Sequence, residues 1–178
     1  FKPGKRKLFY INLSADSFKL GGSSFAQTQN KIGNTAPNIL NDQAFKETFD
    51  WIQNQIKAGN IAAGHDVASG GLITTLLEGC FAETALGAEI NLSGLSDQSL
   101  IEVLFSENAG VILQATNEEF DPIAKNCPLP CIEIGSVTTE PRVKINYHHV
   151  EIGLEIERLR SVWFETSYLF DKHQTANS

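Results

Sequence analysis

The fold of this chain is decided by residues 61–81, which read IAAGHDVASGGLITTLLEGCF. A short apolar run leads into a turn with two glycines, and apolar residues then recur at helical spacing, which predicts a strand, a tight turn and a helix. The first N–H groups of a helix lack partners inside it and can bind an anion such as phosphate. Glycines let the backbone approach that anion closely. Because the same pattern occurs at ordinary turns, a phosphate site and a plain turn both remain open at this point.

The turn carries most of the residues that we expect to contact a nucleotide. Asp66, at the end of the predicted strand, is the candidate Mg²⁺ ligand, because magnesium often uses one or two carboxylates and takes its other ligands from water and phosphate. His65 could contact a phosphate or act as a base, or it could hydrogen-bond to nearby backbone. The other candidates for nucleotide binding in this turn are Ala68, Ser69, Gly70 and Gly71.

Two further segments could contribute to the same site. A second glycine turn, formed by Gly21, Gly22 and Ser23, precedes a predicted short helix and could cradle a phosphate or be an ordinary turn. Glu107 lies between a predicted helix and the next predicted strand. Its carboxylate could face a ligand pocket or cap a neighbouring helix.

The order of predicted elements indicates an α+β fold with α/β/α layers, in which helices pack on a mixed sheet. The last predicted helix, at 150–171, carries an apolar stripe that we expect to be buried, Trp163 included. The stripe consists of Ile152, Ile156, Leu159, Trp163 and Phe170. The clearest helix lies between Asn41 and Gly59, with Phe45, Phe49, Ile52 and Ile56 on one apolar face. Strands are predicted at 8–13, 61–65, 87–92, 110–114, 131–137 and 142–147, and the other helices at 24–31, 71–83, 97–105 (capped by Ser96) and 150–171, with a capping box at 116–119 before a further short helix.

Composition limits the classes of partner. The 178-residue chain has 42% hydrophobic residues and a formal net charge of −7. That hydrophobic share is enough for a core, and the length suits one domain or two small ones. Nucleic acid and anionic membranes attract basic surfaces, and no apolar run is long enough to cross a bilayer, so we expect neither as a partner. The basic residues near the start, Lys2, Lys5, Arg6 and Lys7, are expected to form a solvated tail.

The three cysteines do not form a recognisable site. An odd number argues against a disulfide framework and favours reduced thiols in the cytoplasm. Cys80 lies inside an apolar helical pattern, and neither Cys127 nor Cys131 follows a Gly-x-Cys-x-Gly turn of the kind that presents a nucleophile. We therefore assign no catalytic residue. The chain also lacks an initial methionine, which suggests processing or a longer parent protein.

Four motifs in order resemble one family. They are LGGS at 20–23, HDVASGGL at 65–72, LFSENAG at 104–110 and WFETSY at 163–168. The first three resemble the AIR-synthase-related C-terminal domain of the purine pathway. The fourth is similar to the end of the second such domain in large-type phosphoribosylformylglycinamidine synthases (FGAR amidotransferases). The resemblance implies one domain over residues 8–172, with a linker at 1–7 and the start of another at 173–178.

The resemblance also implies a function for the domain. Such enzymes use ATP and glutamine to convert formylglycinamide ribotide to its amidine. This domain would help to hold an auxiliary nucleotide, ATP or ADP, with Mg²⁺ on Asp66, beside an AIR-synthase N-terminal domain and ahead of a glutaminase domain. The isolated chain would be inactive. Ala68 departs from the family's usual serine, which favours an alternative, a structural domain that has lost its ligand. Another ATP-dependent enzyme of the same superfold is a further alternative.

Overall fold

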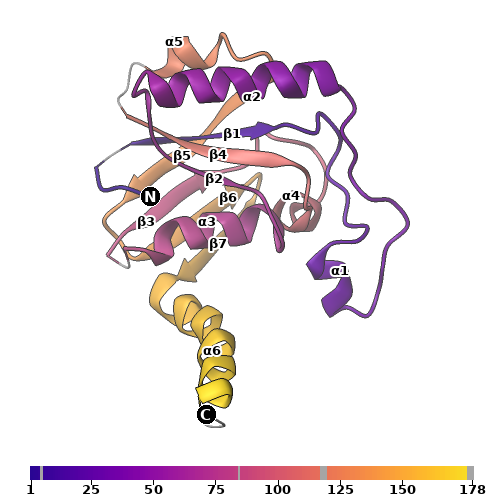
Figure 1. Ribbon diagram of the computed structural model, residues 1–178, viewed down its shortest axis with the longest axis vertical. Coiled ribbons are helices and arrows are strands. Elements are labelled where there is room, and N and C mark those ends of the chain that lie inside the picture. The colour runs from indigo at the N-terminus through magenta and orange to yellow at the C-terminus, as the bar shows by residue number, and fades with distance from the viewer. Residues whose placement is uncertain (5, 84, 117–119, 176–178) are drawn as a thin grey trace.

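The computed structural model describes residues 1–4, 6–83, 85–116 and 120–175, which fold around a seven-stranded mixed sheet (Figure 1). The strands are β1 (Lys7–Asn12), β2 (Ile61–Asp66), β3 (Gly87–Asn91), β4 (Gly110–Ala115), β5 (Cys131–Thr138), β6 (Arg142–Tyr147) and β7 (Val150–Glu155). The helices are α1 (Ser24–Thr28), α2 (Asp42–Lys57), α3 (Gly71–Phe81), α4 (Leu100–Phe105), α5 (Phe120–Ala124) and α6 (Ile156–Thr175). The strand order is β2-β4-β1-β5-β3-β6-β7. Strands β3 and β6 are parallel, and the other described pairs are antiparallel.

Helices cover both faces of this sheet. In Figure 1, α2 and α5 lie on one side of the strands, and α3 and α4 lie on the other. The central strand β1 supplies both cores, because successive side chains of a strand point to opposite faces. Leu8 and Tyr10 pack in the core that includes α3, while Phe9 and Ile11 pack toward α5 and α2. The predicted α/β/α layering around a mixed sheet is confirmed.

The start of the predicted last helix is wrong. Residues Val150–Glu155 form strand β7, which pairs antiparallel with β6, and α6 begins only at Ile156. The two strands meet in a tight turn at His148, which has a positive φ of 51°. Ile152 and Leu154 both pack against the main core, as alternate residues of a strand do. Ile152 and Ile156 also fit one face of a helix, which is the basis of the wrong prediction, but pairing with β6 decides the conformation of this segment.

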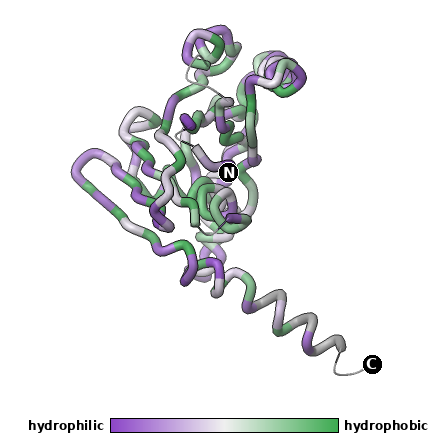
Figure 2. The backbone as a smooth tube through the Cα atoms, turned by 90° about the vertical axis from the view of Figure 1, so that its left-hand side faces the viewer, coloured by the Kyte–Doolittle hydropathy of each residue, from purple (hydrophilic) through white to green (hydrophobic). Residues whose placement is uncertain are grey.

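Helix α6 leaves the body of the domain as an arm, which Figure 2 shows in profile. Ile156 is fully buried at its base, but Trp163 is 46% exposed, so the expected burial of this indole is wrong. The contacts that Trp163 makes with the body of the domain lie at the edge of the core. The Trp163 indole N–H donates to Glu78 Oε1 at 3.1 Å, and its ring centroid lies 5.6 Å from that of Phe81. Among the described helices, none is long and apolar enough to span a bilayer.

These contacts predict a modest effect for Trp163→Ala. The indole hydrogen bond and two aromatic contacts, with Phe81 and with the neighbouring Phe164, are lost. The site is open to solvent and no closed cavity is left, so the free energy of unfolding should fall by about 1–2 kcal/mol. Urea unfolding of the chain measures this. Val162→Ala, on the same exposed helix, is the matched control and should change stability by less than about 0.5 kcal/mol. A loss of about 3–5 kcal/mol, typical of a fully buried tryptophan, would contradict the exposed position.

Helix α2 matches its predicted range, but its apolar stripe is only partly covered. Asn41 caps the helix, since its side chain accepts a hydrogen bond from the Ala44 N–H. Ile52 is buried, whereas Phe49 and Ile56 are 48% and 49% exposed. These two side chains line a pocket beside β2, which is the edge strand of the sheet. Part of the apolar stripe therefore extends beyond the edge of the sheet, where no described strand covers it. Helical periodicity identifies such a stripe but does not show how much of it is covered.

Other predicted boundaries shift by a few residues. Helix α4 begins at Leu100, because Ser99 and Glu102 form a capping box, and not at 97 with Ser96 as the cap. Helix α1 ends at Thr28, two residues before Asn30 takes a positive φ of 54°. The capping box expected at 116–119 falls mainly on residues outside the described part of the chain.

The N-terminal residues are docked, which contradicts the expected solvated tail for Lys2 and Lys7. Lys7 belongs to β1, and its ammonium group lies 2.6 Å from Asp121 Oδ2 and 2.8 Å from Glu133 Oε2. These hydrogen bonds raise the pKa of Lys7 well above its usual value. The Lys2 backbone exchanges two hydrogen bonds of 2.8 Å with the buried Gln114 amide. Lys5 lies outside the described residues.

Candidate functional site

The central turn connects β2 to α3 as predicted. Strand β2 ends at Asp66, and Val67 N–H then donates to Gly110 O at 2.8 Å, which holds the turn against β4. Gly70 and Gly71 have φ values of +89° and +74°, a conformation that favours glycine. The sequence therefore folds locally as a strand, a turn with two left-handed residues and a helix.

Gly71 is required by packing. A Cβ atom at this position would lie 2.7 Å from the Leu104 carbonyl oxygen and 2.8 Å from that of Ser106. The start of α3 thus rests directly on the backbone at the end of α4. The absence of a side chain at Gly71 therefore lets the backbones of α3 and α4 approach each other closely. This role is additional to the close approach to an anion that the sequence suggested.

Glu107 joins the two glycine turns. Its Oε1 atom accepts a hydrogen bond from Gly70 N–H and another from Ser24 N–H, each at 2.8 Å. The donors belong to segments 46 residues apart in the sequence, and the structure brings them to a single carboxylate oxygen. The capping role considered for Glu107 is therefore present, because Gly70 is the N-cap residue of α3 and Ser24 is the first residue of α1.

The groups of the second glycine turn are engaged within the chain. Gly21 N–H donates to Thr35 O at 2.9 Å, and Gly22 N–H donates to Ile32 O at 2.7 Å. The buried Ser23 hydroxyl caps α1 by accepting from the Ala26 N–H at 3.2 Å. This turn consequently closes the loop around α1, and a phosphate would have to replace these bonds to use the same N–H groups.

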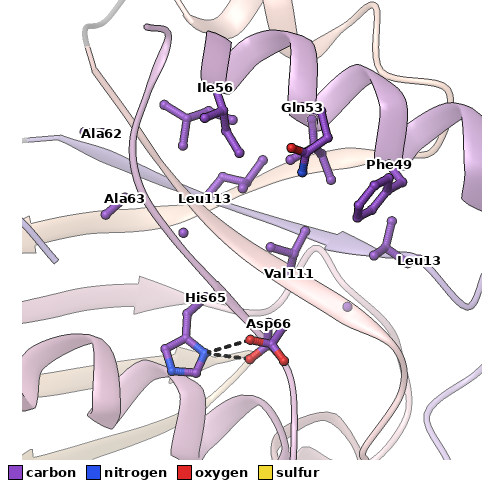
Figure 3. Close-up of a pocket in the computed structure, with 14 residues that line it drawn as sticks. Leu13, Phe49, Gln53, Ile56, Ala62, Ala63, His65, Asp66, Val111 and Leu113 are labelled. Atoms are coloured by element: carbon purple, nitrogen blue, oxygen red, sulfur yellow. Dashed lines mark hydrogen bonds and ion pairs between the residues drawn. The ribbon is translucent and has the colours of Figure 1, made fainter.

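Asp66 and His65 lie side by side at the end of β2, where Figure 3 shows both side chains. The Asp66 side chain is 83% exposed, so its carboxylate is accessible from solvent. His65 Nδ1 is 2.7 Å from the Asp66 carbonyl oxygen, the backbone contact that the sequence left as one alternative. His65 Nε2 is 3.4 Å from Glu78 Oε2. Sequence reasoning missed Glu78, although its being the only charged residue of α3 was a usable signal.

The side chains around Asp66 provide only part of a magnesium site. In the described ranges no three His, Cys, Asp or Glu side chains gather at metal-binding distance. Asp66 could supply one hard oxygen ligand, and phosphate, water or another domain would have to supply the rest, as is common for Mg²⁺. Ala68 and Ser69, later in the turn, are both exposed to solvent.

A pocket of about 420 Å³ adjoins Asp66 between α2 and the edge strand β2 (Figure 3). Its lining is mostly apolar and includes Phe49, Ile56 and Val111, with Asp66 and His65 also contributing. The pocket thus places a carboxylate beside an apolar surface.

The residues on either side of Glu107 form a buried polar network that the sequence did not reveal. The Ser106 hydroxyl donates to Lys19 O and accepts from Lys19 N–H, both at 3.0 Å. The Asn108 amide donates to Ser14 Oγ at 2.9 Å and to Ser17 O at 3.1 Å. Ser106 and Asn108 therefore hold the loop after β1, while Glu107 between them holds the glycine turns.

Asp16 in this loop predicts a pH-dependent contribution to stability. Its side chain is only 6% exposed, and its carboxylate lies 2.6 Å from Lys19 Nζ and accepts a hydrogen bond from Asn38 N–H. These contacts, above all the one with Lys19, lower the pKa of Asp16 below its usual value. A depressed carboxyl pKa stabilises the fold above the unfolded-state pKa, and this contribution is lost as pH falls through the folded-state pKa. Asp16→Asn should therefore cost about 1.5–3 kcal/mol near neutral pH, with the difference shrinking below the ordinary value of 3.8.

Urea unfolding of both proteins across pH measures the Asp16 effect. Asp50→Asn is the control, because Asp50 is 61% exposed and its ion-pair distance to Lys46 is 3.8 Å. A difference for Asp16→Asn that stays constant from neutral to strongly acidic pH would contradict the prediction.

The cysteines are poor nucleophiles in this fold. Burial raises the pKa of the Cys80 thiol to about 11 and that of Cys131 to about 12. Both thiols are therefore protonated at neutral pH, and the thiolate is the reactive form.

Comparison with known proteins places this fold. The family model described as "AIR synthase related protein, C-terminal domain" matches residues 14–148. The chain is 30% identical over 172 residues to the probable phosphoribosylformylglycinamidine synthase, chloroplastic/mitochondrial, of Arabidopsis thaliana, an alignment that covers 94% of this chain and 12% of that protein. The chain thus spans about an eighth of the length of this relative.

Solved structures show the same fold at lower identity. Thermotoga maritima PurL complexed with FGAR superposes with a TM-score of 0.68 at 18% identity, covering 89% of this chain and 28% of that one. The same protein complexed with ATP gives 0.64 at 17% identity, covering 89% and 26%. Because the family model matches most of the chain, this protein belongs to the AIR synthase related, C-terminal domain family.

Proposed function

We propose that this chain is the second AIR-synthase-related C-terminal domain of a phosphoribosylformylglycinamidine synthase and forms one wall of an auxiliary magnesium–nucleotide site. The observation that carries the proposal is the exposed Asp66 carboxylate at the end of β2, next to the exposed turn residues Ala68 and Ser69. The name of the Arabidopsis relative and the ATP complex of Thermotoga PurL support it. The full enzyme would convert formylglycinamide ribotide to the amidine with ATP and glutamine.

Each residue of the turn would have a limited role. Asp66 would hold Mg²⁺, which when bound neutralises phosphate charge. The exposed turn at Ala68 and Ser69 would face the phosphates of ATP or ADP, with the Ser69 hydroxyl as an available donor. Gly70 and Gly71 would shape the turn, and His65 would orient the strand end through its bond to the Asp66 carbonyl. We assign no catalytic side chain, so reaction at the amide would take place elsewhere in the full enzyme.

The proposal includes the surroundings of the domain. Residues 8–172 would form the domain, with residues 1–7 and 173–178 joining it to neighbours. An AIR-synthase N-terminal domain would complete the nucleotide site, and a glutaminase domain would supply ammonia. The free thiols of Cys80, Cys127 and Cys131 are consistent with our placing the protein in the cytoplasm.

Binding of Mg-ADP separates this proposal from a purely structural role. Half of the site would lie outside the chain, so the 178-residue chain alone should bind weakly and form no amidine. A synthase that contains this domain should retain ADP and magnesium after gel filtration, beyond the amount held by a version with the domain's Asp66 replaced. Tight binding by the isolated chain, or amidine formation by it, would show that the site is complete here and overturn the proposed division.

A ligand-free structural domain is the second candidate, and Ala68 is the observation that favours it. Restoring a hydroxyl by Ala68→Ser distinguishes the two. One hydrogen bond to a charged group is worth about 1.5–3 kcal/mol, so nucleotide affinity should rise about tenfold or more if phosphates lie at this turn. Unchanged affinity in calorimetry on nucleotide-stripped protein would favour the structural role.

A further inference from the structure

The carboxylate of Glu107 lies where the first residues of α3 and α1 come together. Its Oε1 atom accepts from Gly70 N–H, at the N-cap of α3, and from Ser24 N–H, in the first turn of α1. Such N–H groups have no partner within their helices and carry partial positive charge. A negatively charged side chain is therefore a favourable partner for both, and a single oxygen atom serves the two donors.

The backbone that carries Glu107 is fixed on both sides. Ser106 and Asn108 are almost fully buried, and their side chains bind the loop after β1. Phe105, one residue earlier, stacks on Phe25 of α1 with ring centroids 4.6 Å apart. The carboxylate is therefore presented from a rigid segment.

The same segment also fixes the start of α3. Gly71 packs against the backbone from Leu104 to Ser106, where a Cβ atom would meet carbonyl oxygens at 2.7–2.8 Å. Both helix starts are thus seated on residues 104–107, and Glu107 supplies the hydrogen bonds that connect them.

We propose that Glu107 is a positioning residue, which holds the Gly70 turn and the α1 segment at a fixed separation and thereby shapes the nucleotide site. The proposal rests on the proposed function and specifies how that site is built. The Gly70 N–H already donates to the Glu107 carboxylate and is therefore not free to bind phosphate. The exposed part of the turn, at Ala68 and Ser69, would then be the part that faces phosphate. Glu107 then acts through the backbone of the turn and does not touch the nucleotide.

Amide hydrogen exchange on the isotopically labelled 178-residue chain tests the positioning role without any ligand. Glu107→Ala should accelerate exchange at both Ser24 and Gly70 by about tenfold or more, while Leu113 in β4 keeps its rate. Glu107→Gln retains an acceptor and should accelerate both by a smaller factor. Glu151→Gln, on the exposed edge strand β7, is the matched control and should leave both rates unchanged.

The exchange result can overturn the proposal. If neither or only one of the two amides responds in Glu107→Ala, the shared carboxylate does not couple the turns. If Glu107→Ala fails to fold, Glu107→Gln decides, and joint acceleration of the two amides with an unchanged Leu113 rate supports the proposal. Unchanged rates at both amides in Glu107→Gln would then overturn it.

Nucleotide affinity in a synthase containing this domain tests the consequence for the site. Glu107→Ala should weaken Mg-ADP binding at least tenfold, Glu107→Gln should restore part of it, and Glu151→Gln should bind as the unmodified protein does. If the unmodified protein binds no Mg-ADP, the proposed function fails, while the exchange experiment still decides whether the turns are coupled. If the unmodified protein binds and Glu107→Ala binds equally well, positioning by Glu107 is overturned and the proposed function stands.

Discussion

Replacing Gly71 with alanine should lower the free energy of unfolding by about 2–6 kcal/mol. The residue has a φ of +74°, and left-handed conformations cost a non-glycine residue about 1–3 kcal/mol. The new Cβ atom would also lie 2.7 Å from Leu104 O and 2.8 Å from both Phe105 C and Ser106 O. These are backbone atoms, so relief requires moving α3 or the end of α4, and overpacking of this kind typically costs a further 1–3 kcal/mol, roughly.

Gly22→Ala is a closely matched control for this prediction. Gly22 has a similar φ of +78°, but a Cβ atom there would have nothing within 4 Å. Its loss should therefore be limited to the same conformational cost of about 1–3 kcal/mol, with no added cost from close packing. Urea unfolding of the two variants separates backbone strain from close packing. Equal losses for Gly71→Ala and Gly22→Ala would show that the contact with α4 contributes nothing.

Local sequence signals predicted the turn because all the interactions that define it lie within a few residues. The glycines at 70–71 and the apolar periodicity that follows are sufficient to specify a strand, a turn and a helix. Helix α2 was found for the same reason, since its cap at Asn41 and its apolar stripe are adjacent in sequence. The α/β/α layering followed from the order of such elements.

Features that depend on distant pairing could not be read in the same way. Glu107 meets Ser24 across 83 residues and Gly70 across 37, and nothing in the local pattern specifies those partners. Strand β7 was mistaken for helix because its apolar residues fit both periods, and β6 as a neighbour decided between them. The prediction that Trp163 is buried was wrong for a similar reason, because periodicity identifies the apolar face of a helix but not whether another element covers that face.

The family resemblance contributed what local physics could not. The resemblance rests on segments 20–23, 65–72 and 104–110, and in the structure Glu107 of the third segment bonds to Gly70 in the second and to Ser24, directly after the first. The resemblance did not supply the mechanism of that connection. The hydrogen bonds show that the Glu107 carboxylate is engaged with the protein's own backbone, which fits a positioning role, whereas the exposed Asp66 is the residue that would face the ligand.

Asp66→Asn should weaken Mg-ADP binding at least tenfold in a synthase that contains this domain, while leaving the fold intact. The Asp66 side chain is 83% exposed, so its replacement removes no core packing, and stability should change by less than about 0.5 kcal/mol. The neutral amide keeps the shape of the carboxylate but removes the charge that binds a hard cation. Among the described residues no three His, Cys, Asp or Glu side chains gather at metal-binding distance, so no ready-made metal site in that part of the chain stands behind Asp66.

Calorimetry on nucleotide-stripped protein, together with magnesium content after gel filtration, measures the Asp66 effect. Asp50→Asn is the control, since Asp50 is similarly exposed on α2 and lies on a different element from the turn. The loss should appear with Mg-ADP and be much smaller with ADP in the presence of a chelator, because in the proposed site the carboxylate would act through the metal. If Asp66→Asn retains nucleotide and magnesium as the unmodified protein does, Asp66 is only a turn residue, and the structural role suggested by Ala68 becomes the better account of this domain.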